Sequence, residues 1–202
     1  MESLRPDVVE KRKAFIRKVR RIPAEKLVFL DESAMHIAMS RSHAWVQRGE
    51  EFIDHVPANW GKYNWTFLGA IRLSGWVLLT SIYGSAKKDT FVRWFRKRLL
   101  PKLKRGDVIV MDNLSAHHDP RVAVACREAG VRLLYLPPYS PDFNPIEPSW
   151  ALQKQYVRRH APRDARTLRQ LARRARYRVK PRHCRGWFKA AGYRVNSADR
   201  WG

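Results

Sequence analysis

The chain has 202 residues, of which 45% are hydrophobic and eight are tryptophan, so it is long enough for one domain with a buried core. Lysine and arginine total 41 against 18 aspartate and glutamate, a formal net charge of +23. This excess predicts a polyanionic partner, most simply nucleic acid. No apolar run approaches the ~20 residues that a membrane-spanning helix needs.

Two cysteines do not make a disulfide framework, and the N-terminus shows no signal peptide. A reducing, cytoplasmic location is therefore expected.

The first part of the chain predicts a helix and then strands. Residues 1–25 are basic and polar and predict a short helix or linker. Residues 27–30 form a short apolar run that is typical of a strand buried on both faces. Residues 42–50 predict a second strand. Residues 63–84 predict two strands around a turn at Ser74-Gly75.

Helices and strands alternate in the second part. The pattern predicts a helix over 89–100 with Asp89 as its N-cap, a strand over 108–111, a helix that Asp119-Pro120 begins and Gly130 ends, and a strand over 131–136. The resulting fold class is a mixed sheet with helices packed on it.

The C-terminal segment carries most of the net charge. Its apolar residues share one helical stripe: Leu168, Leu171, Ala172, Ala175 and Val179. The arginines between them fit either a solvated face or a surface that faces phosphate groups. We expect three regions: a basic linker or helix over 1–25, a core domain over 26–160 and a basic helical segment over 161–202.

Asp31 and Asp112 share a local context, because each follows a buried apolar run and is predicted to end a strand. If the two strands are parallel neighbours, both carboxylates lie at one sheet edge. Two carboxylates that close together need a proton, a cationic partner or a metal ion. Oxygen ligands at an open site suit Mg²⁺ or Mn²⁺. Each aspartate alone also fits a simpler role as a turn former or helix cap.

Glu147 has two interpretations that spacing alone leaves open. Asn144-Pro145-Ile146-Glu147 follows the capping-box pattern, with Asn144 as the N-cap and Glu147 three residues later. In that interpretation Glu147 bonds back to the start of its helix. In the other, Glu147 is a third metal ligand.

Three sequence blocks resemble a known family. "FLDES", "VIVMDNLSAHH" and "LLYLPPYSPDFNPIEPSWALQK" are similar to the signature blocks of DDE transposases of the mariner superfamily, specifically its bacterial insertion-sequence branch (the insertion sequence 630 group). Thirty-four residues separate Asp112 from Glu147, which is typical of that superfamily. The resemblance runs from about Lys26 to Tyr193.

The resemblance implies an α/β, RNase H-like fold: a mixed five-stranded sheet flanked by helices. It also implies that Asp31, Asp112 and Glu147 hold two divalent ions, Mg²⁺ or Mn²⁺, for DNA strand cleavage and strand transfer. Glu32, Asn113 and His117 match positions expected to support these ligands. Basic residues of the last helices are expected to contact DNA: Lys154, Arg158, Arg159, Arg173 and Arg174.

The expected partners are double-stranded DNA, as transposon ends and target, and a second copy of the chain, because two ends must be joined. Relatives carry helix-turn-helix domains before the catalytic core, and only about 25 residues precede Lys26 here. We therefore expect a frameshift-fused or separately encoded recognition module in a bacterial, nucleoid-associated setting. Two alternatives stay open: a catalytically inactive DNA-binding remnant, and an RNase H-like nuclease that acts on RNA–DNA hybrids.

Overall fold

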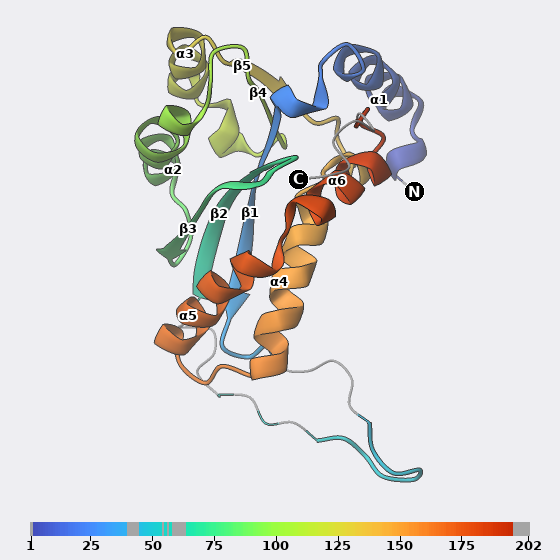
Figure 1. Ribbon diagram of the computed structural model, residues 1–202, viewed down its shortest axis with the longest axis vertical. Coiled ribbons are helices and arrows are strands. Elements are labelled where there is room, and N and C mark those ends of the chain that lie inside the picture. Colours follow the sequence, from blue (N-terminus) through green and yellow to red (C-terminus); the bar gives the residue numbers. More distant parts are fainter. Residues whose placement is uncertain (1, 40–44, 54, 56, 58–63, 196–202) are drawn as a thin grey trace.

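The computed structural model of the chain describes residues 2–39, 45–53, 55, 57 and 64–195. Its centre is a five-stranded sheet with the order β3-β2-β1-β4-β5 (Figure 1). The strands are β1 (Leu27–His36), β2 (Asn64–Arg72), β3 (Gly75–Tyr83), β4 (Val108–Met111) and β5 (Arg132–Tyr135). The pairs β1–β2 and β2–β3 are antiparallel, whereas β1–β4 and β4–β5 are parallel. The sheet is therefore mixed, as the sequence predicted.

Helices cover both faces of this sheet. They are α1 (Pro6–Val19), α2 (Lys88–Trp94), α3 (Pro120–Glu128), α4 (Glu147–His160), α5 (Ala165–Ala175) and α6 (Pro181–Ala190). A π-helical stretch, Phe95–Leu99, prolongs α2. Short 3₁₀ turns complete the described elements: Glu2–Leu4, Ala24–Lys26, Leu100–Lys102, Ser115–His118, Pro141–Phe143 and Arg176–Arg178. No helix in the described residues has both the length and the apolar character to cross a membrane.

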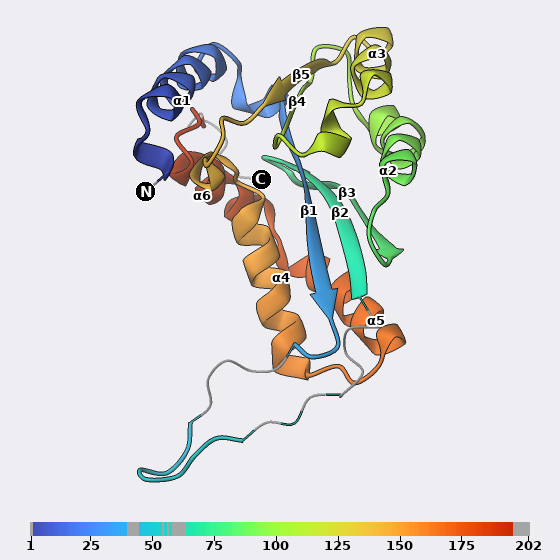
Figure 2. The ribbon, with the colours of Figure 1, turned by 180° about the vertical axis from the view of Figure 1, so that it is seen from behind.

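The alternation of side chains along β1 creates two cores. Leu27 and Phe29 join a cluster with residues of α1, α4, α5 and α6, whereas Val28 and Leu30 join a second cluster with residues of α2 and α3. Figure 2 shows the same division, with α2 and α3 on one side of β1 and α4 on the other. The continuous apolar run follows from this double burial, because both faces of the strand need apolar side chains.

Several predicted elements are confirmed. The hairpin is β2–β3, and the helix over 89–100 buries Phe91, Phe95 and Leu99 completely. The apolar stripe of the C-terminal segment is buried in α5 and just beyond it. Leu168, Leu171 and Ala172 of this stripe belong to the same core cluster as residues of α4.

Two local predictions were wrong. The predicted strand over 42–50 lies partly outside the described residues, and from Trp45 to Glu50 the chain forms no strand. Trp45 is fully exposed, so nothing packs on this stretch to favour pairing. Asp89 is not the N-cap of α2, because the helix begins at Lys88 and its N-cap is Lys87, two residues before Asp89. The Asp89 carboxylate instead accepts a hydrogen bond from Arg121, 2.6 Å away.

Candidate active site

Asp31 lies in the interior of β1, in the centre of the sheet. The prediction that Asp31 ends its strand was wrong, because β1 pairs with β2 as far as His36. The parallel pairing with β4 reaches only Phe29. Asp31 is therefore fixed by pairing with β2 on one side, while its other side adjoins the segment that follows β4.

The Asp31 carboxylate is 7% exposed and has three donors. The backbone amide of Glu32 donates to Oδ1 at 2.7 Å, and the Trp150 indole Nε1 donates to Oδ2 at 3.1 Å. The Asn144 side-chain amide donates to the same Oδ2 at 3.4 Å. Asn144 lies in the connector after β5 and Trp150 lies in α4. These two hydrogen bonds therefore join the segment around Glu147 directly to β1.

Gly69 makes room for the contact between Trp150 and Asp31. It lies opposite Asp31 in the β1–β2 register. A β-carbon at this position would lie 2.6 Å from ring atoms of both Trp150 and Trp76. Sequence reasoning missed Gly69 and Trp150. Trp150 could have been found from its spacing, because it is three residues after Glu147 and so lies on the same side of the helix.

Asp112 directly follows β4, as predicted. Phe29 of β1 pairs with Val110 of β4. Asp31 and Asp112 each follow these partners by two residues, so they lie beside each other at the same height of the sheet. The imidazole Nδ1 of His117, a fully buried residue, lies 2.6 Å from Asp112 Oδ1. Its Nε2 lies 3.7 Å from a carboxylate oxygen of Glu32.

This arrangement shifts the pKa values of both members of the Asp112–His117 pair. Burial acts to lower the pKa of His117, but Asp112 and then Glu32 outweigh it and raise the pKa to about 9. Burial acts to raise the pKa of Asp112, and the hydrogen bond and charge of His117 outweigh it and lower the pKa. His117 therefore keeps Asp112 ionised and limits how its carboxylate can rotate.

Glu147 is the first residue of α4, and its side chain is exposed. The capping-box interpretation was wrong. Ile146, not Asn144, precedes the helix and no side chain caps it. Asn144 is buried, and its amide is directed to Asp31. The Glu147 carboxylate thus has no capping role in this structure.

The three acids interact electrostatically. Burial raises the pKa of Asp31 most, and the negative charges of Glu147 and Asp112 raise it further, to about 7. Partial burial and the charge of Asp112 also raise the pKa of Glu147, while Lys154 opposes them. The charges of Asp112 and Glu147 are therefore felt at Asp31, although the chain as a whole is strongly basic.

Asp31, Asp112 and Glu147 would suit a hard divalent cation as ligands, because they offer only carboxylate oxygens. Within the part of the chain that the structure describes, no three His, Cys, Asp or Glu side chains are already grouped closely enough to hold a metal ion. The triad assignment therefore remains a prediction that the chemistry of the site supports.

The Asp31 pKa leads to a test of stability against pH. The folded chain keeps a proton on Asp31 up to about pH 7, whereas an unfolded aspartate loses it near 3.8. Between pH 4 and 7 the folded chain therefore binds one more proton at Asp31 than the unfolded chain does. Because of this difference, the free energy of unfolding falls as the pH rises through this range. Asp31→Asn removes that loss. In urea denaturation with EDTA, the stability of Asp31→Asn relative to wild type is expected to increase across this pH range. A difference that does not change with pH would contradict the assigned pKa.

The predicted supporting residues occupy different places. His117 contacts Asp112 as described, and Glu32 is half-buried beyond His117. Asn113 is exposed and donates to the Leu136 carbonyl at 2.6 Å. This hydrogen bond connects the segment after β4 to the end of β5. It is directed to a backbone carbonyl and not to a carboxylate of the candidate site.

The predicted DNA-contacting residues fall into two groups. Lys154 and Arg158 are half-buried and lie two and three helical turns after Glu147, on the same side of α4. Lys154 is close enough to influence the Glu147 carboxylate. Arg159 is exposed, and Arg173 and Arg174 are exposed on the side of α5 that faces away from its buried stripe. Their contact with DNA remains a prediction.

Comparison with known proteins decides the family. A family model described as a DDE superfamily endonuclease matches residues 26–169, more than half of the chain. The chain belongs to the DDE superfamily endonucleases. The transposase of transposable element Tcb2 from Caenorhabditis briggsae is 26% identical over an alignment 144 residues long, which covers 65% of this chain and 51% of that protein. This DDE endonuclease chain thus spans about half the length of that relative.

Solved structures share the fold of the DDE endonuclease chain. A Mos1 mariner paired-end complex with Mn matches with a TM-score of 0.68 and 14% identity, over 93% of this chain and 59% of that one. The Mos1 transposase catalytic domain with Raltegravir and Mg matches with a TM-score of 0.56 and 12% identity, over 96% of this chain and 99% of that one. The likeness confirms the predicted RNase H-like architecture.

Proposed function

We propose that this chain is the catalytic domain of a transposase that cleaves DNA strands and joins them to target DNA. Two observations support the proposal: the chain belongs to the DDE superfamily endonucleases, and Glu147 and Asp112 lie near enough to Asp31 to raise the pKa of its carboxyl group. These residues come from the middle of β1, the end of β4 and the start of α4. Folding stability alone does not favour repulsion between acids that are far apart in sequence, so a role in binding a cation is the simpler explanation.

The chain's own residues prepare the site. Trp150 and Asn144 orient the Asp31 carboxylate, and His117 orients Asp112. Two divalent ions, Mg²⁺ or Mn²⁺, held by Asp31, Asp112 and Glu147 would supply activation of the attacking oxygen and stabilisation of the leaving oxygen. The protein's contribution is then positioning and electrostatic stabilisation, with no covalent protein–DNA intermediate.

We further infer that the substrates are double-stranded transposon ends and target DNA, and that two copies of the chain act together. The net charge of +23 supports a DNA partner. The Mos1 relatives include complexes with paired ends and with a left transposon end. A bacterial insertion-sequence origin and a cytoplasmic location complete the proposal.

The decisive assay is the nicking of supercoiled plasmid by the purified chain. Open-circular product is expected to accumulate with Mg²⁺ or Mn²⁺ and to disappear with EDTA. A labelled duplex with a free 3′-hydroxyl is expected to join to the same plasmid. Nicking that persists in EDTA would contradict the proposal.

Two other outcomes would support the alternative functions. DNA binding without cleavage, together with no heat of Mg²⁺ binding in calorimetry, would identify an inactive remnant. Faster cleavage of an RNA–DNA hybrid than of duplex DNA would identify an RNase H-like nuclease.

A further inference from the structure

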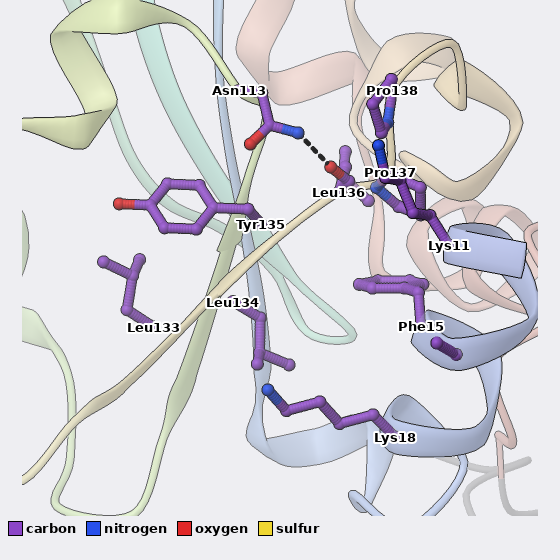
Figure 3. A pocket seen from close by; sticks show the side chains of 11 residues that line it. Lys11, Phe15, Lys18, Asn113, Leu133, Leu134, Tyr135, Leu136, Pro137 and Pro138 are labelled. Atoms are coloured by element: carbon purple, nitrogen blue, oxygen red, sulfur yellow. Dashed lines mark hydrogen bonds between the residues drawn. The ribbon is translucent and has the colours of Figure 1, made fainter. Parts of the chain in front are cut away.

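A groove runs between α1 and the exposed edge of β5, at the end of the sheet. Figure 3 shows Lys11, Phe15 and Lys18 on α1 opposite the β5 residues. The groove has a volume of about 390 Å³. Its floor is apolar and includes the buried side chains of Phe15, Leu134 and Leu136. A second hollow shares Ala14 and Lys18 with it and extends it along α1.

The rim of this extended groove is strongly basic. Five cations line it and no acid does: Lys11, Arg17, Lys18, Arg21 and Arg132. Among the described residues, one of these cations has an ion pair, Lys11 with Asp7 at 3.6 Å, and both partners are well exposed. Such a pair is weak and exchanges readily for another anion. The other four charges are uncompensated by ion pairs within the described chain.

The edge of β5 adds hydrogen-bond donors. The amides of Arg132 and Leu136 donate to carbonyls of Asp107 and Met111 on the β4 side. Because alternate residues of a strand point their amides to opposite sides, those of Leu133 and Tyr135 are directed into the groove. Backbone amides beside lysines and arginines are typical contacts of phosphate oxygens.

The groove begins beside the candidate active site. Asn113 lines its upper end and directly follows Asp112. The wall of the groove is also fixed to the connector that leads to Glu147. Arg12 of α1 donates to Ser140 at 2.8 Å and to Asp142 at 2.5 and 2.9 Å. A chain held in the groove is therefore held at a defined position relative to the carboxylates.

We propose that this groove binds the sugar–phosphate backbone of the DNA strand that enters or leaves the carboxylate site. The inference rests on the proposed function for the identity of the ligand. The alternative of a second copy of this chain is disfavoured, because a chain of net charge +23 is repelled by a basic groove. Lys11 and Lys18 lie seven residues apart on one side of α1, about 10 Å, a distance that spans two or three phosphates of one strand.

The test compares two double variants with equal loss of charge. Lys11→Gln/Lys18→Gln removes the lysines of the groove, and Lys13→Gln/Arg20→Gln removes two exposed cations from the opposite side of the same segment. Fluorescence anisotropy with a labelled DNA duplex, at a series of salt concentrations and in EDTA, measures binding without cleavage. The negative slope of log K against log salt is expected to become shallower by about 1.8 in the groove variant, for two lost phosphate contacts on duplex DNA. The control slope is expected to change by less than about 0.5.

Equal slopes for both variants would overturn the proposal, because general charge would then explain the binding. A second measurement needs no variant: acetylation of wild-type lysines with and without DNA. DNA is expected to protect Lys11 and Lys18 several-fold and to leave Lys13 reactive. Unprotected groove lysines would also overturn the proposal. Both readouts are independent of catalysis, so an intact groove with no nicking would count against the proposed function alone.

Discussion

Glu147→Gln is expected to reduce plasmid nicking about a thousandfold while the protein stays folded. The substitution removes a charge that, in the proposed mechanism, helps hold a divalent ion. Such ions contribute several kcal/mol to transition-state stabilisation, and about 4 kcal/mol corresponds to three orders of magnitude in rate. The stability cost is expected to be below about 1 kcal/mol, because an exposed acid in the first turn of a helix contributes only that much. Nicking rates and urea denaturation measure the two effects.

Glu128→Gln is the matched control for this prediction. Glu128 is also an exposed helical glutamate, at the end of α3, and its pair with Arg96 is 3.7 Å long and solvent-exposed. Its substitution is expected to leave both nicking and stability close to wild type. If Glu147→Gln retained full activity, Glu147 would not be a member of the catalytic site.

Gly69→Ala is expected to lower the free energy of unfolding by about 2–3 kcal/mol, because it overpacks a buried site. The new methyl group would overlap Trp150 and Trp76 at 2.6 Å, and Trp150 is 2% exposed. Moving Trp150 also weakens its hydrogen bond to Asp31, so nicking is expected to fall as well. Urea denaturation gives the first quantity and the plasmid assay the second.

Gly186→Ala is the matched control, because it is expected to raise the free energy of unfolding where Gly69→Ala lowers it. Gly186 lies within α6, and a β-carbon there would meet nothing within 4 Å. Gly186→Ala is expected to stabilise the chain by up to about 1 kcal/mol, because alanine favours the helix. If Gly69→Ala were as stable as wild type, the close approach of the two tryptophans would not limit this position.

Local patterns in the sequence predicted most of the fold. The apolar runs before Asp31 and Asp112 became β1 and β4 because both faces of these strands are buried. The parallel arrangement of those strands was the condition for bringing the two aspartates together, and the structure meets it. Within the described part of the predicted strand, residues 45–50, the prediction failed because these residues are exposed and no surface packs on them.

Long-range contacts could not be read from the same patterns. Asn144 matches a capping box, yet its side chain is 113 residues away in sequence from the carboxylate to which it donates. The Asn144 side chain can bond either to the start of its helix or to the buried Asp31 carboxylate. Local spacing does not show which of the two it contacts. Gly69 was hidden for the same reason: nothing near it in sequence shows that two indole rings lie against it. The end of β1 was misplaced because its extension depends on pairing with β2.

The length of β1 has a consequence for how the candidate site can respond to a substrate. Asp31 sits in a continuously paired strand, five residues before the strand ends, whereas Asp112 follows the last residue of β4 and Glu147 begins α4. Paired strand interiors are the last parts of a protein to open, and the ends of elements are the first. The carboxylates of Asp112 and Glu147 can therefore shift when a substrate binds, whereas the Asp31 carboxylate stays in place. Evolution can retune this site through the loop after β4 and the proline-rich connector, without disturbing the central strand.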